Sequence, residues 1–332
     1  MKRSVQMVRY FSMFSGIGGF ELGIEQAAEE LGLTTECVGY SEIDGPAIKT
    51  YEEHFDHHNY GDATGINAAD LPDFELLVGG FPCQAFSIAG KRRGFEESRG
   101  TLFFDIARIL KAKQPRNFIL ENVKGLLSHD GGRTVRTIIG TLTELGYCVE
   151  WQVLNSKNHG VPQNRERIYI VGHLGGPSGR QVFPFTEESE GNLREITRGG
   201  SASQRIYEPF LSPTLNPGVT SGGPELAKFA VVRNRRGNDV GYGQREIATC
   251  LDANYWKGID YHGARTGIAH LISGELSVRK LTPTECERLQ GFPDGWTVGK
   301  DTQRYKQCGN AVTVNVVRDV AARLFRTWEA EV

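Results

Sequence analysis

The 332-residue sequence lacks the cysteine pairs that mark zinc sites and disulfide-bonded folds. Its six cysteines are widely spaced, at positions 37, 83, 148, 250, 286 and 308, and none forms a C-x-x-C pair. This spacing indicates free thiols in a reducing compartment and no bound metal. One group of histidines, His54, His57 and His58, lies in an acidic and aromatic stretch, which favours a solvated turn over a metal site.

Long apolar runs are also missing. No stretch approaches the length needed to cross a bilayer, and the first residues lack the apolar core of a signal peptide. We therefore expect a cytoplasmic protein without a membrane segment. An apolar fraction of 39% is typical of a globular chain. The length allows one large α/β unit with a smaller second domain.

A strong net charge is missing too, which argues at first sight against a nucleic-acid partner. The formal charge is −2, but it is unevenly distributed. Residues 196–280 hold 11 Lys and Arg against 7 Asp and Glu, a local charge of +4 that leaves −6 on the remainder. Because electrostatic fields are screened within about 10 Å, such a basic segment is able to bind phosphates on its own.

The segment 78–95 contains the clearest candidate for chemistry. An apolar run, residues 74–78, ends in two glycines, and Cys83 follows directly after Pro82. Open α/β sheets place their chemistry just beyond the ends of strands. We therefore interpret Cys83 as a nucleophile, and the alternative is a buried structural cysteine. The polar loop that follows is expected to close over an anionic polymer, through Ser87, Lys91, Arg92 and Arg93.

The N-terminal part predicts a strand, a glycine turn and a helix. Residues 8–14 form a buried apolar run, and a helical pattern continues to Leu31. Between them, Gly16, Gly18 and Gly19 let the backbone approach a ligand closely. This layout is typical of a nucleotide-binding first unit. The spacing departs from strict G-x-G-x-x-G, so a pyrophosphate is not the necessary ligand.

Acidic residues follow the next strands. Glu42 comes after a second short strand, where a carboxylate suits the hydroxyls of a ribose. Ile43 is placed to cover a flat base, and Asp62 to accept from an adenine amino group. The alternative for the first acid is the start of a helix, because Asp44 and Pro46 resemble a cap and a first turn.

The middle of the chain continues the alternation of strands and helices. Apolar periodicity predicts helices over residues 101–113 and 134–145 and strands over 118–120, 149–154 and 167–171. Glu121 ends one of these strands and is a candidate acid–base group, whose pKa desolvation would raise; the alternative is a loop acid without a role.

Arg165 and Arg167 alternate along the chain, so they face one way if the chain is extended there. Two guanidiniums on one side suit a carbonyl oxygen or a phosphate. The alternative is surface ion pairing with Glu166.

The composition changes after residue 172, where Gly, Pro, Ser and Thr become frequent and periodicity fades. Residues 228–272 then combine basic and aromatic side chains, which suits contacts to bases and phosphates, although a solvated basic surface is an equal alternative. The basic candidates are Arg233, Arg235, Arg236, Arg245 and Lys257. Thr282 and Glu285 form a capping box, with Pro283 in the first turn, that predicts a new helix.

Several motifs occur in order between Tyr10 and about Val317. They are Phe14-x-Gly-x-Gly-Gly19, Glu42, Pro82-Cys-Gln84, Glu121-Asn-Val123, Gln163-x-Arg-x-Arg167, Arg279-Lys-Leu-Thr-Pro-x-Glu285 and Gly309-Asn310. Together they resemble the DNA (cytosine-5) methyltransferases of the compact kind found in bacterial and viral restriction–modification systems. The match is weak over residues 180–275, where that family carries its target-recognition region. Ala89 and Ala311 stand where relatives can have serine.

The resemblance implies a Rossmann-like α/β methyltransferase domain with a mostly parallel sheet, plus a smaller, irregular, β-rich target-recognition domain. We expect the catalytic and cofactor-binding domain at 1–180 and the target-recognition domain at 181–278. A hinge at 279–306 and a C-terminal helix at 307–332, which returns to the catalytic domain, complete the expected organisation.

The resemblance also implies S-adenosylmethionine as methyl donor, S-adenosylhomocysteine as its product and no metal. The matching cofactor positions are Phe14, Gly16, Ile17, Gly18, Gly19, Glu42, Ile43, Asp62, Ala63, Pro82, Leu102 and Asn310. Cys83 would attack C6 of a cytosine swung out of the duplex, Glu121 would contact N3, and Arg165 or Arg167 would contact O2. Adding the thiolate at C6 makes C5 reactive toward the methyl group.

The implied partner is double-stranded DNA, bound by a monomer in the cytoplasm, and a separate cognate restriction endonuclease is compatible with it. Two other functions stay open at this point. One is methylation of cytosine in RNA, and the other is a regulator that binds DNA without turnover. Intact Cys83, Glu121 and both arginines argue against the regulator.

Overall fold

The structure is a computed structural model. It describes residues 7–82, 102–176, 181–185, 195–196, 206–207, 229–234, 240–245, 248–257, 266–272 and 275–329. Several candidates named above lie outside these residues: Cys83, Ser87, Lys91, Arg92, Arg93, Arg235 and Arg236.

The chain divides into two compact units. The first unit combines Met1–Leu154, Glu166–Phe185 and Val316–Val332, and the second combines Asn155–Arg165 and Thr186–Asn315. The domain limits expected from the sequence stay a prediction. Within the described residues, no helix combines the length and the apolarity needed to cross a membrane.

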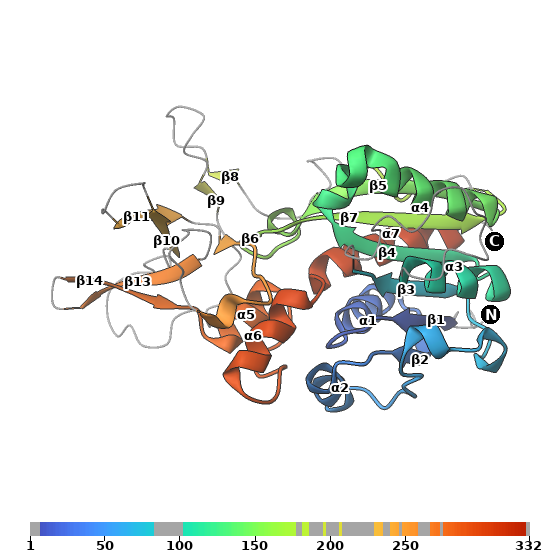
Figure 1. Ribbon diagram of the computed structural model, residues 1–332, viewed down its shortest axis with the longest axis horizontal. Coiled ribbons are helices and arrows are strands. Elements are labelled where there is room, and N and C mark those ends of the chain that lie inside the picture. Colours follow the sequence, from blue (N-terminus) through green and yellow to red (C-terminus); the bar gives the residue numbers. More distant parts are fainter. Residues whose placement is uncertain are drawn as a thin grey trace. The chain divides into compact units, whose positions relative to one another are not determined.

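A six-stranded sheet forms the centre of the first unit (Figure 1). Its order is β2 (Thr34–Ser41), β1 (Met7–Met13), β3 (Leu76–Gly80), β4 (Asn117–Val123), β7 (Glu166–Leu174) and β5 (Tyr147–Asn155). The pairs β1–β2, β1–β3 and β3–β4 are parallel, whereas β7 runs antiparallel to β4. The predicted α/β class is confirmed, with a sheet that is mixed and mostly parallel.

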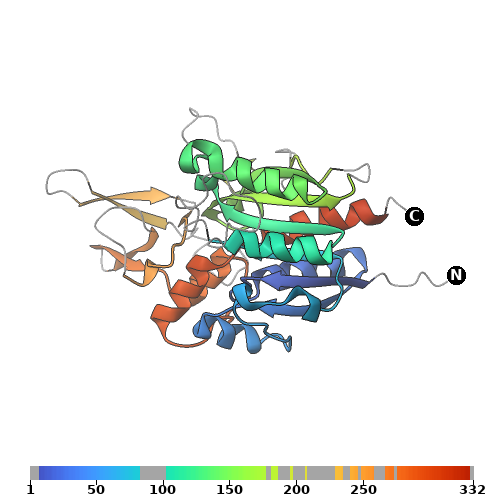
Figure 2. The ribbon, with the colours of Figure 1, turned by 45° about the vertical axis from the view of Figure 1, so that its right-hand side comes forward.

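Helices cover both faces of this sheet. The predicted helices at 101–113 and 134–145 are α3 (Leu102–Lys113) and α4 (Arg133–Glu144), and they lie on one face, whereas α7 (Val314–Glu329) lies on the other (Figure 2). Two further helices, α1 (Gly19–Leu31) and α2 (Gly45–Glu52), follow the first two strands. The face beneath α3 and α4 forms a continuous apolar core with alternate strand residues, among them Phe11, Leu77, Phe118 and Leu120.

The last helix is fixed to the sheet by polar contacts as well as by apolar packing. The indole nitrogen of Trp328 donates to Oδ1 of Asn117 at 2.8 Å, and both residues are buried. Arg318 lies 3.5 Å from the carboxylate of Glu30 on α1. Residues from the two ends of the chain therefore belong to one folded unit.

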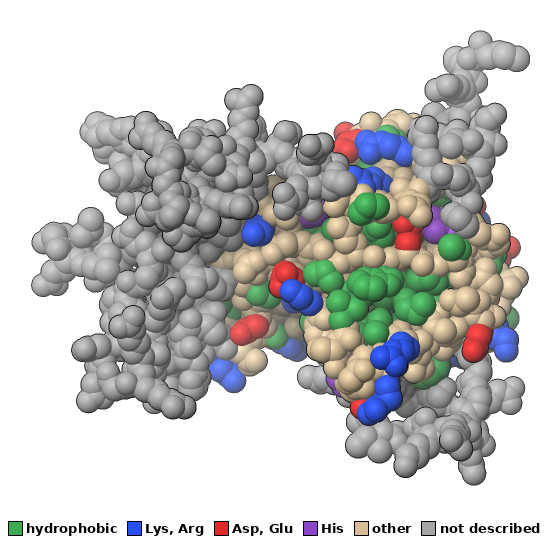
Figure 3. Space-filling view, turned by 90° about the horizontal axis from the view of Figure 1, so that it is seen from above, with side chains coloured by type: hydrophobic (Ala, Val, Ile, Leu, Met, Phe, Trp, Pro, Cys, Tyr) green, Lys and Arg blue, Asp and Glu red, His purple; other side chains and the backbone are tan. Residues whose placement is uncertain are grey.

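Strand β5 is an edge strand, and a short segment of chain satisfies its polar side chains. Glu150 accepts hydrogen bonds from the backbone N–H groups of Val182 and Phe183, and Gln152 exchanges two with Phe185. These bonds attach residues 182–185 to the side chains of β5. The face that includes this edge carries a group of hydrophobic side chains with Lys and Arg near it (Figure 3). Trp151 on β5 is 46% exposed.

The second unit is built around a four-stranded antiparallel sheet with the order β11-β10-β13-β14. These strands are β10 (Phe229–Asn234), β11 (Val240–Arg245), β13 (Thr266–Ile272) and β14 (Glu275–Lys280). Two short pairs accompany them: β8 (Glu195–Ile196) with β9 (Ile206–Tyr207), and β6 (Gln163–Asn164) with β12 (Ala248–Thr249).

Two helices follow the antiparallel sheet, α5 (Pro283–Leu289) and α6 (Asp301–Asn310). The predicted capping box is confirmed, because Thr282 and Glu285 exchange hydrogen bonds across the first turn of α5. Single turns of 3₁₀ helix complete the description: η1 (Ala63–Gly65), η2 (Ala68–Asp70), η4 (Lys124–Leu127), η5 (His129–Gly132), η6 (Ser156–Asn158) and η8 (Tyr255–Lys257).

Candidate active site

Four strands of the first unit deliver candidate residues to one edge of the sheet. Because β1, β2, β3 and β4 are mutually parallel, their carboxyl ends lie at the same edge. Phe14, Glu42, Phe81 and Glu121 occupy or directly follow these ends. This edge is where open α/β sheets bind ligands.

The turn after β1 has a backbone that favours glycine. Gly16 and Gly18 have φ angles of +59° and +85°, and Phe14 also has a positive φ of +55°. A Cβ atom on Gly18 would lie 2.4 Å from the ring of Phe55, so no larger residue fits there without displacing that ring. Ile17 is buried within the turn. The turn is therefore held tightly enough to present its backbone to a ligand.

Glu42 links the ends of β1 and β2. Its Oε2 accepts from the backbone N–H of Gly16 at 2.9 Å, and its Oε1 accepts from those of Ile43 and Asp44 at 2.8 Å. A carboxylate offers about four acceptor sites, so three bonds leave room for a ribose hydroxyl. Asp44 is the N-cap residue of α2, with proline in the first turn, so the predicted start of a helix is confirmed and the contact of Glu42 with a ribose stays a prediction.

Asn59 holds Glu42 in place through hydrogen bonds. Asn59 was not identified from the sequence as a site residue. Its side chain bonds both the backbone N–H and the carbonyl of Glu42, at 3.3 and 3.2 Å, and accepts from Gly61 N–H at 2.9 Å. An isolated parallel bridge joins Asn59 to Tyr40 on β2. In the sequence, Asn59 is a short polar residue two positions before Gly61, and this pattern is the signal that could have found it. In the structure Gly61 has a φ of +70°.

The candidate adenine contacts come from two segments: Ile43 directly follows Glu42, and Asp62 directly follows Gly61, whose carbonyl accepts from Ser41 at the end of β2. Ile43 is 72% exposed, which leaves its side chain available to a ligand. Asp62 caps η1, and the hydrogen bond from the backbone of Thr64 lowers its pKa. Ala63 is buried, and its carbonyl accepts from Arg108 at 2.9 Å.

The remaining cofactor candidates occupy different parts of the chain. Pro82 is exposed immediately after the buried Phe81, and Leu102 begins α3. Asn310 ends α6 in the second unit and is exposed there.

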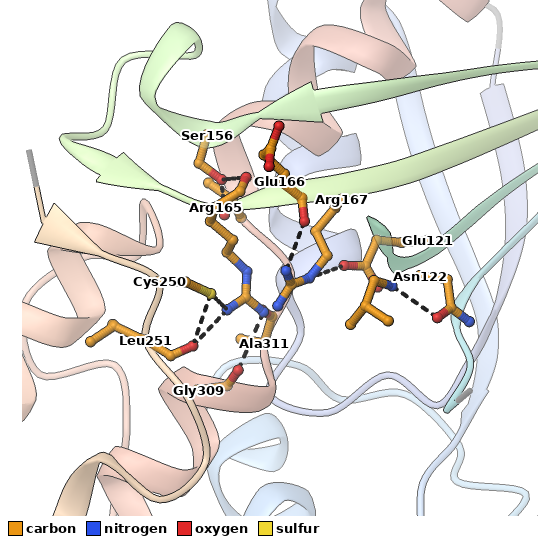
Figure 4. A network of polar contacts seen from close by, with 12 residues as sticks. Glu121, Asn122, Ser156, Arg165, Glu166, Arg167, Cys250, Leu251, Gly309 and Ala311 are labelled. Carbon is orange, nitrogen blue, oxygen red and sulfur yellow. Dashed lines mark hydrogen bonds and ion pairs between the residues drawn. The ribbon is translucent and has the colours of Figure 1, made fainter. Parts of the chain in front are cut away.

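Glu121 forms an ion pair with Arg167 at the end of β4 (Figure 4). Nε of Arg167 lies 3.1 Å from Oε1 of Glu121, and both side chains are largely buried. In the antiparallel register, Arg167 faces Val123, so it lies diagonally across from Glu121 on the same face of the sheet. The carboxylate of Glu166 pairs instead with Lys124, at 2.8 Å.

Arg165 has a different environment, within the second unit. Its guanidinium is buried and donates to the carbonyls of Leu251, Gly309 and Ala311 at 2.9, 3.2 and 2.8 Å (Figure 4). The sulfur of Cys250 lies 3.4 Å from the same group. Arg165 lies between β6 and β7, outside any regular strand, whereas Arg167 lies on β7. That the two guanidiniums face one way stays a prediction.

Glu21, in the first turn of α1, is a fully buried acid that the sequence did not single out. The hydroxyl of Tyr51 donates to its Oε1 at 3.1 Å and lies 2.9 Å from Nδ1 of His57. Burial raises the pKa of Glu21 to about 7, although the hydrogen bond from Tyr51 acts in the opposite direction. Among the described residues, no group of three or more His, Cys, Asp or Glu is arranged to hold a metal ion.

The DNA-reading candidates that the structure describes belong to the second unit. Arg233 lies on β10 opposite Gly241, and Arg245 lies on β11 opposite Phe229. Lys257 ends η8 and is exposed. These residues thus occur on an antiparallel hairpin and on the loop that follows it.

Comparison with known proteins gives a consistent result. Residues 8–326 match a family model described as C-5 cytosine-specific DNA methylase. The chain is similar to the type II methyltransferase M.HhaI of Haemophilus parahaemolyticus, with 38% identity over 318 residues that cover 95% of this chain and 93% of that protein. It is also similar to M.HpaII of Haemophilus parainfluenzae, with 40% identity over 331 residues, 95% of this chain and 88% of that protein.

Solved structures show the same fold. The Entamoeba histolytica methyltransferase EhMeth superposes with a TM-score of 0.66 over 97% of this chain and 98% of its own, at 16% identity. The S. pombe Dnmt2 methyltransferase gives a TM-score of 0.62 over the same shares, at 18% identity. At such identities the likeness concerns the fold alone.

Proposed function

The chain belongs to the C-5 cytosine-specific DNA methylase family, and from this premise we propose that it modifies cytosine within one duplex sequence through a covalent bond between Cys83 and C6. Its relatives named above are type II methyltransferases, which supports modification at a specific site, as in a restriction–modification system. The observation that carries the proposal is the Glu121–Arg167 pair, one strand away from the end of β3 that leads into Pro82 and Cys83.

The chemistry explains why a thiol is needed. C5 of cytosine is a poor nucleophile, and addition of the Cys83 thiolate to C6 shifts the ring electrons so that C5 becomes enamine-like. S-adenosylmethionine supplies an electrophilic methyl group and departs as S-adenosylhomocysteine. A base then takes the C5 proton, and the electrons of that C–H bond restore the C5–C6 double bond as Cys83 leaves C6 as a thiolate. The base must first swing out of the duplex, which costs a few kcal/mol.

Glu121 and Arg167 suit the two polar atoms of the ring that gain charge when the thiolate adds. Glu121 would hold or donate a proton at N3, and Arg167 would donate to O2. Their mutual contact means that each carries a partner of opposite charge before a base arrives. Arg165 is not proposed for O2, because its Nη1 and Nη2 atoms already donate to three backbone carbonyls.

The turn after β1 and the tip of β2 fit S-adenosylmethionine. Glu42 retains acceptor capacity for a ribose, exposed Ile43 would lie against the adenine, and Asp62 would accept from its amino group. The full proposed set is Phe14, Gly16, Ile17, Gly18, Gly19, Glu42, Ile43, Asp62, Ala63, Pro82, Leu102 and Asn310. The left-handed backbone at Gly16 and Gly18 supports the close approach that such a ligand requires.

Sequence-specific contacts are assigned to the second unit. Arg233, Arg245 and Lys257 lie on its hairpin and following loop, where long cations would reach phosphates or base edges. We propose double-stranded DNA as the partner and a separately acting restriction endonuclease as the companion enzyme.

The proposal is tested with labelled S-adenosylmethionine, duplex DNA of mixed sequence and a transfer RNA pool. We expect label at C5 of cytosine in the DNA of wild-type reactions, and none with Cys83→Ala, although that variant still binds the cofactor. Label in RNA alone, or normal turnover by Cys83→Ala, would overturn the proposal.

A further inference from the structure

The chain leaves the sheet after β3 at a point that backbone pairing does not secure. The register between β3 and β4 ends with Gly80 opposite Glu121. Pro82 has no N–H and therefore cannot donate to a further ladder bond. The carbonyl of Phe81, the last residue before this proline, needs a donor from elsewhere.

Asn122 supplies that donor from its side chain. Its Nδ2 donates to the carbonyl of Phe81 at 2.8 Å, while its Oδ1 accepts from the backbone N–H of Val123 at 2.8 Å. Asn122 is 2% exposed, and its bond to the carbonyl of Phe81 is buried. The side-chain amide of Asn122 thus supplies one further hydrogen bond between β4 and the chain after β3, beyond the last backbone pair.

Phe81 is fixed by its side chain as well. The ring is buried in the core beneath α3, with its centroid 5.6 Å from that of Phe103. Together, the ring contact and the carbonyl bond define where residue 81 lies and in which direction its peptide group points. Cys83 follows only two residues later.

Glu121 and Asn122, which are neighbours on β4, therefore contact two different segments, β7 and the end of β3. Successive side chains of a strand point to opposite faces, and Glu121 reaches Arg167 while Asn122 reaches the carbonyl of Phe81. We propose that Asn122 is a positioning residue for methyl transfer, which sets the Pro82–Cys83 segment against Glu121 by holding the carbonyl of Phe81. This inference rests on the roles of Cys83 and Glu121 proposed above.

If Asn122 only stabilised the fold, its loss would have the same effect on catalysis as the loss of any equally buried side chain. Asn117 on the same strand provides this control. Asn117 begins β4, is also 2% exposed, donates to the carbonyl of Gly172 at 3.0 Å and accepts from Trp328. Its side-chain nitrogen also lies 3.0 Å from Nδ1 of His173. Asn117 is therefore as buried as Asn122 and is hydrogen-bonded at the opposite end of the strand. Loss of either amide removes buried hydrogen bonds, but only Asn122 bonds a carbonyl that lies two residues before Cys83 in the sequence.

The test compares Asn122→Ala, Asn122→Asp and Asn117→Ala with the wild type. The measured quantity is the rate of covalent complex formation on duplex DNA containing 5-fluorocytosine, at saturating DNA and cofactor and well below each midpoint of thermal unfolding. Cofactor affinity is measured in parallel by calorimetry. Asn122→Asp keeps the size and the acceptor of asparagine but, when ionised, cannot donate to Phe81, so it remains informative where the alanine variant fails to fold.

We expect both Asn122 variants to slow trapping by about 10- to 100-fold, because small misplacements of reacting groups have effects of that order. Cofactor affinity should stay within about twofold of wild type, and Asn117→Ala should trap at the wild-type rate despite its lowered stability. Wild-type trapping by the Asn122 variants, or equal slowing by Asn117→Ala, would overturn the inference. Absence of trapping by an active wild-type enzyme would refute the Cys83 mechanism itself, and the inference with it.

Discussion

Nε of Arg167 lies 3.1 Å from Oε1 of Glu121, across two strands that run in opposite directions. The reversal of β7 brings the beginning of that strand to the edge where β4 ends. A parallel β7 would have placed Arg167 at the far end of the sheet. The pairs β1–β2, β1–β3 and β3–β4 are parallel, so the candidate active site depends on the reversal of direction at β4–β7.

Arg167→Ala is expected to lower the rate of methyl transfer at saturating substrates by about 10²- to 10³-fold, the usual effect of losing one donor to developing oxyanion charge. Because the pair with Glu121 is largely buried, the variant should also lose thermal stability, so rates are compared well below its midpoint of unfolding. Single-turnover kinetics with labelled cofactor measure the rate. A variant that transfers methyl groups as fast as wild type would remove Arg167 from the site.

Arg165→Ala is expected to lower the stability of the protein. The substitution leaves three backbone carbonyls of the second unit without their buried donor, at a cost of about 1–3 kcal/mol for each unsatisfied group before relaxation. We expect a clear loss of stability in urea unfolding. An Arg165→Ala protein as stable as wild type would show that these bonds contribute little in solution.

Glu42→Gln is expected to weaken S-adenosylmethionine binding, because the amide nitrogen would face backbone N–H groups that now donate to a carboxylate. The expected increase in Kd is on the order of 10- to 100-fold, given that bonds to charged groups contribute about 1.5–3 kcal/mol. Calorimetric titration measures it. Glu53→Gln, an exposed substitution at the end of α2, is the matched control. Equal affinities for the two variants would contradict the assignment of Glu42.

Glu21 predicts a specific dependence of stability on pH. Its pKa is raised by burial from 4.5 to about 7 in the folded protein, so between these values the folded state binds a proton that the unfolded state releases. The free energy of unfolding should therefore fall as pH rises through this window. Glu21→Gln cannot ionise and should escape this loss, with a relative gain at pH 8 on the order of 3 kcal/mol. Urea unfolding at pH 4.5 and 8 tests this, and an equal effect of the substitution at both values would contradict it.

The sequence predicts the local elements well because their signals are local. The apolar spacing that defines α3 and α4, and the Thr282–Glu285 capping box of α5, depend on residues within a few positions of each other. The family resemblance rests on ordered motifs and is confirmed by the match over residues 8–326.

Features set by pairing between distant segments are less accessible from the sequence. The direction of β7 depends on its register with β4, and the break at Arg165 depends on partners near residues 251 and 309–311. Asn59 and Asn122 act through their side-chain amides on backbone groups that are 17 and 41 positions away. No periodicity in the chain encodes such contacts.

The central claim is that the Cys83 sulfur bonds to the cytosine ring. The most direct measurement is peptide mass spectrometry of the complex formed on 5-fluorocytosine DNA with S-adenosylmethionine. We predict a nucleotide adduct on the peptide that contains Cys83. An adduct on a peptide that carries Cys250 or any other residue instead, or methylated DNA released without any adduct, would contradict it.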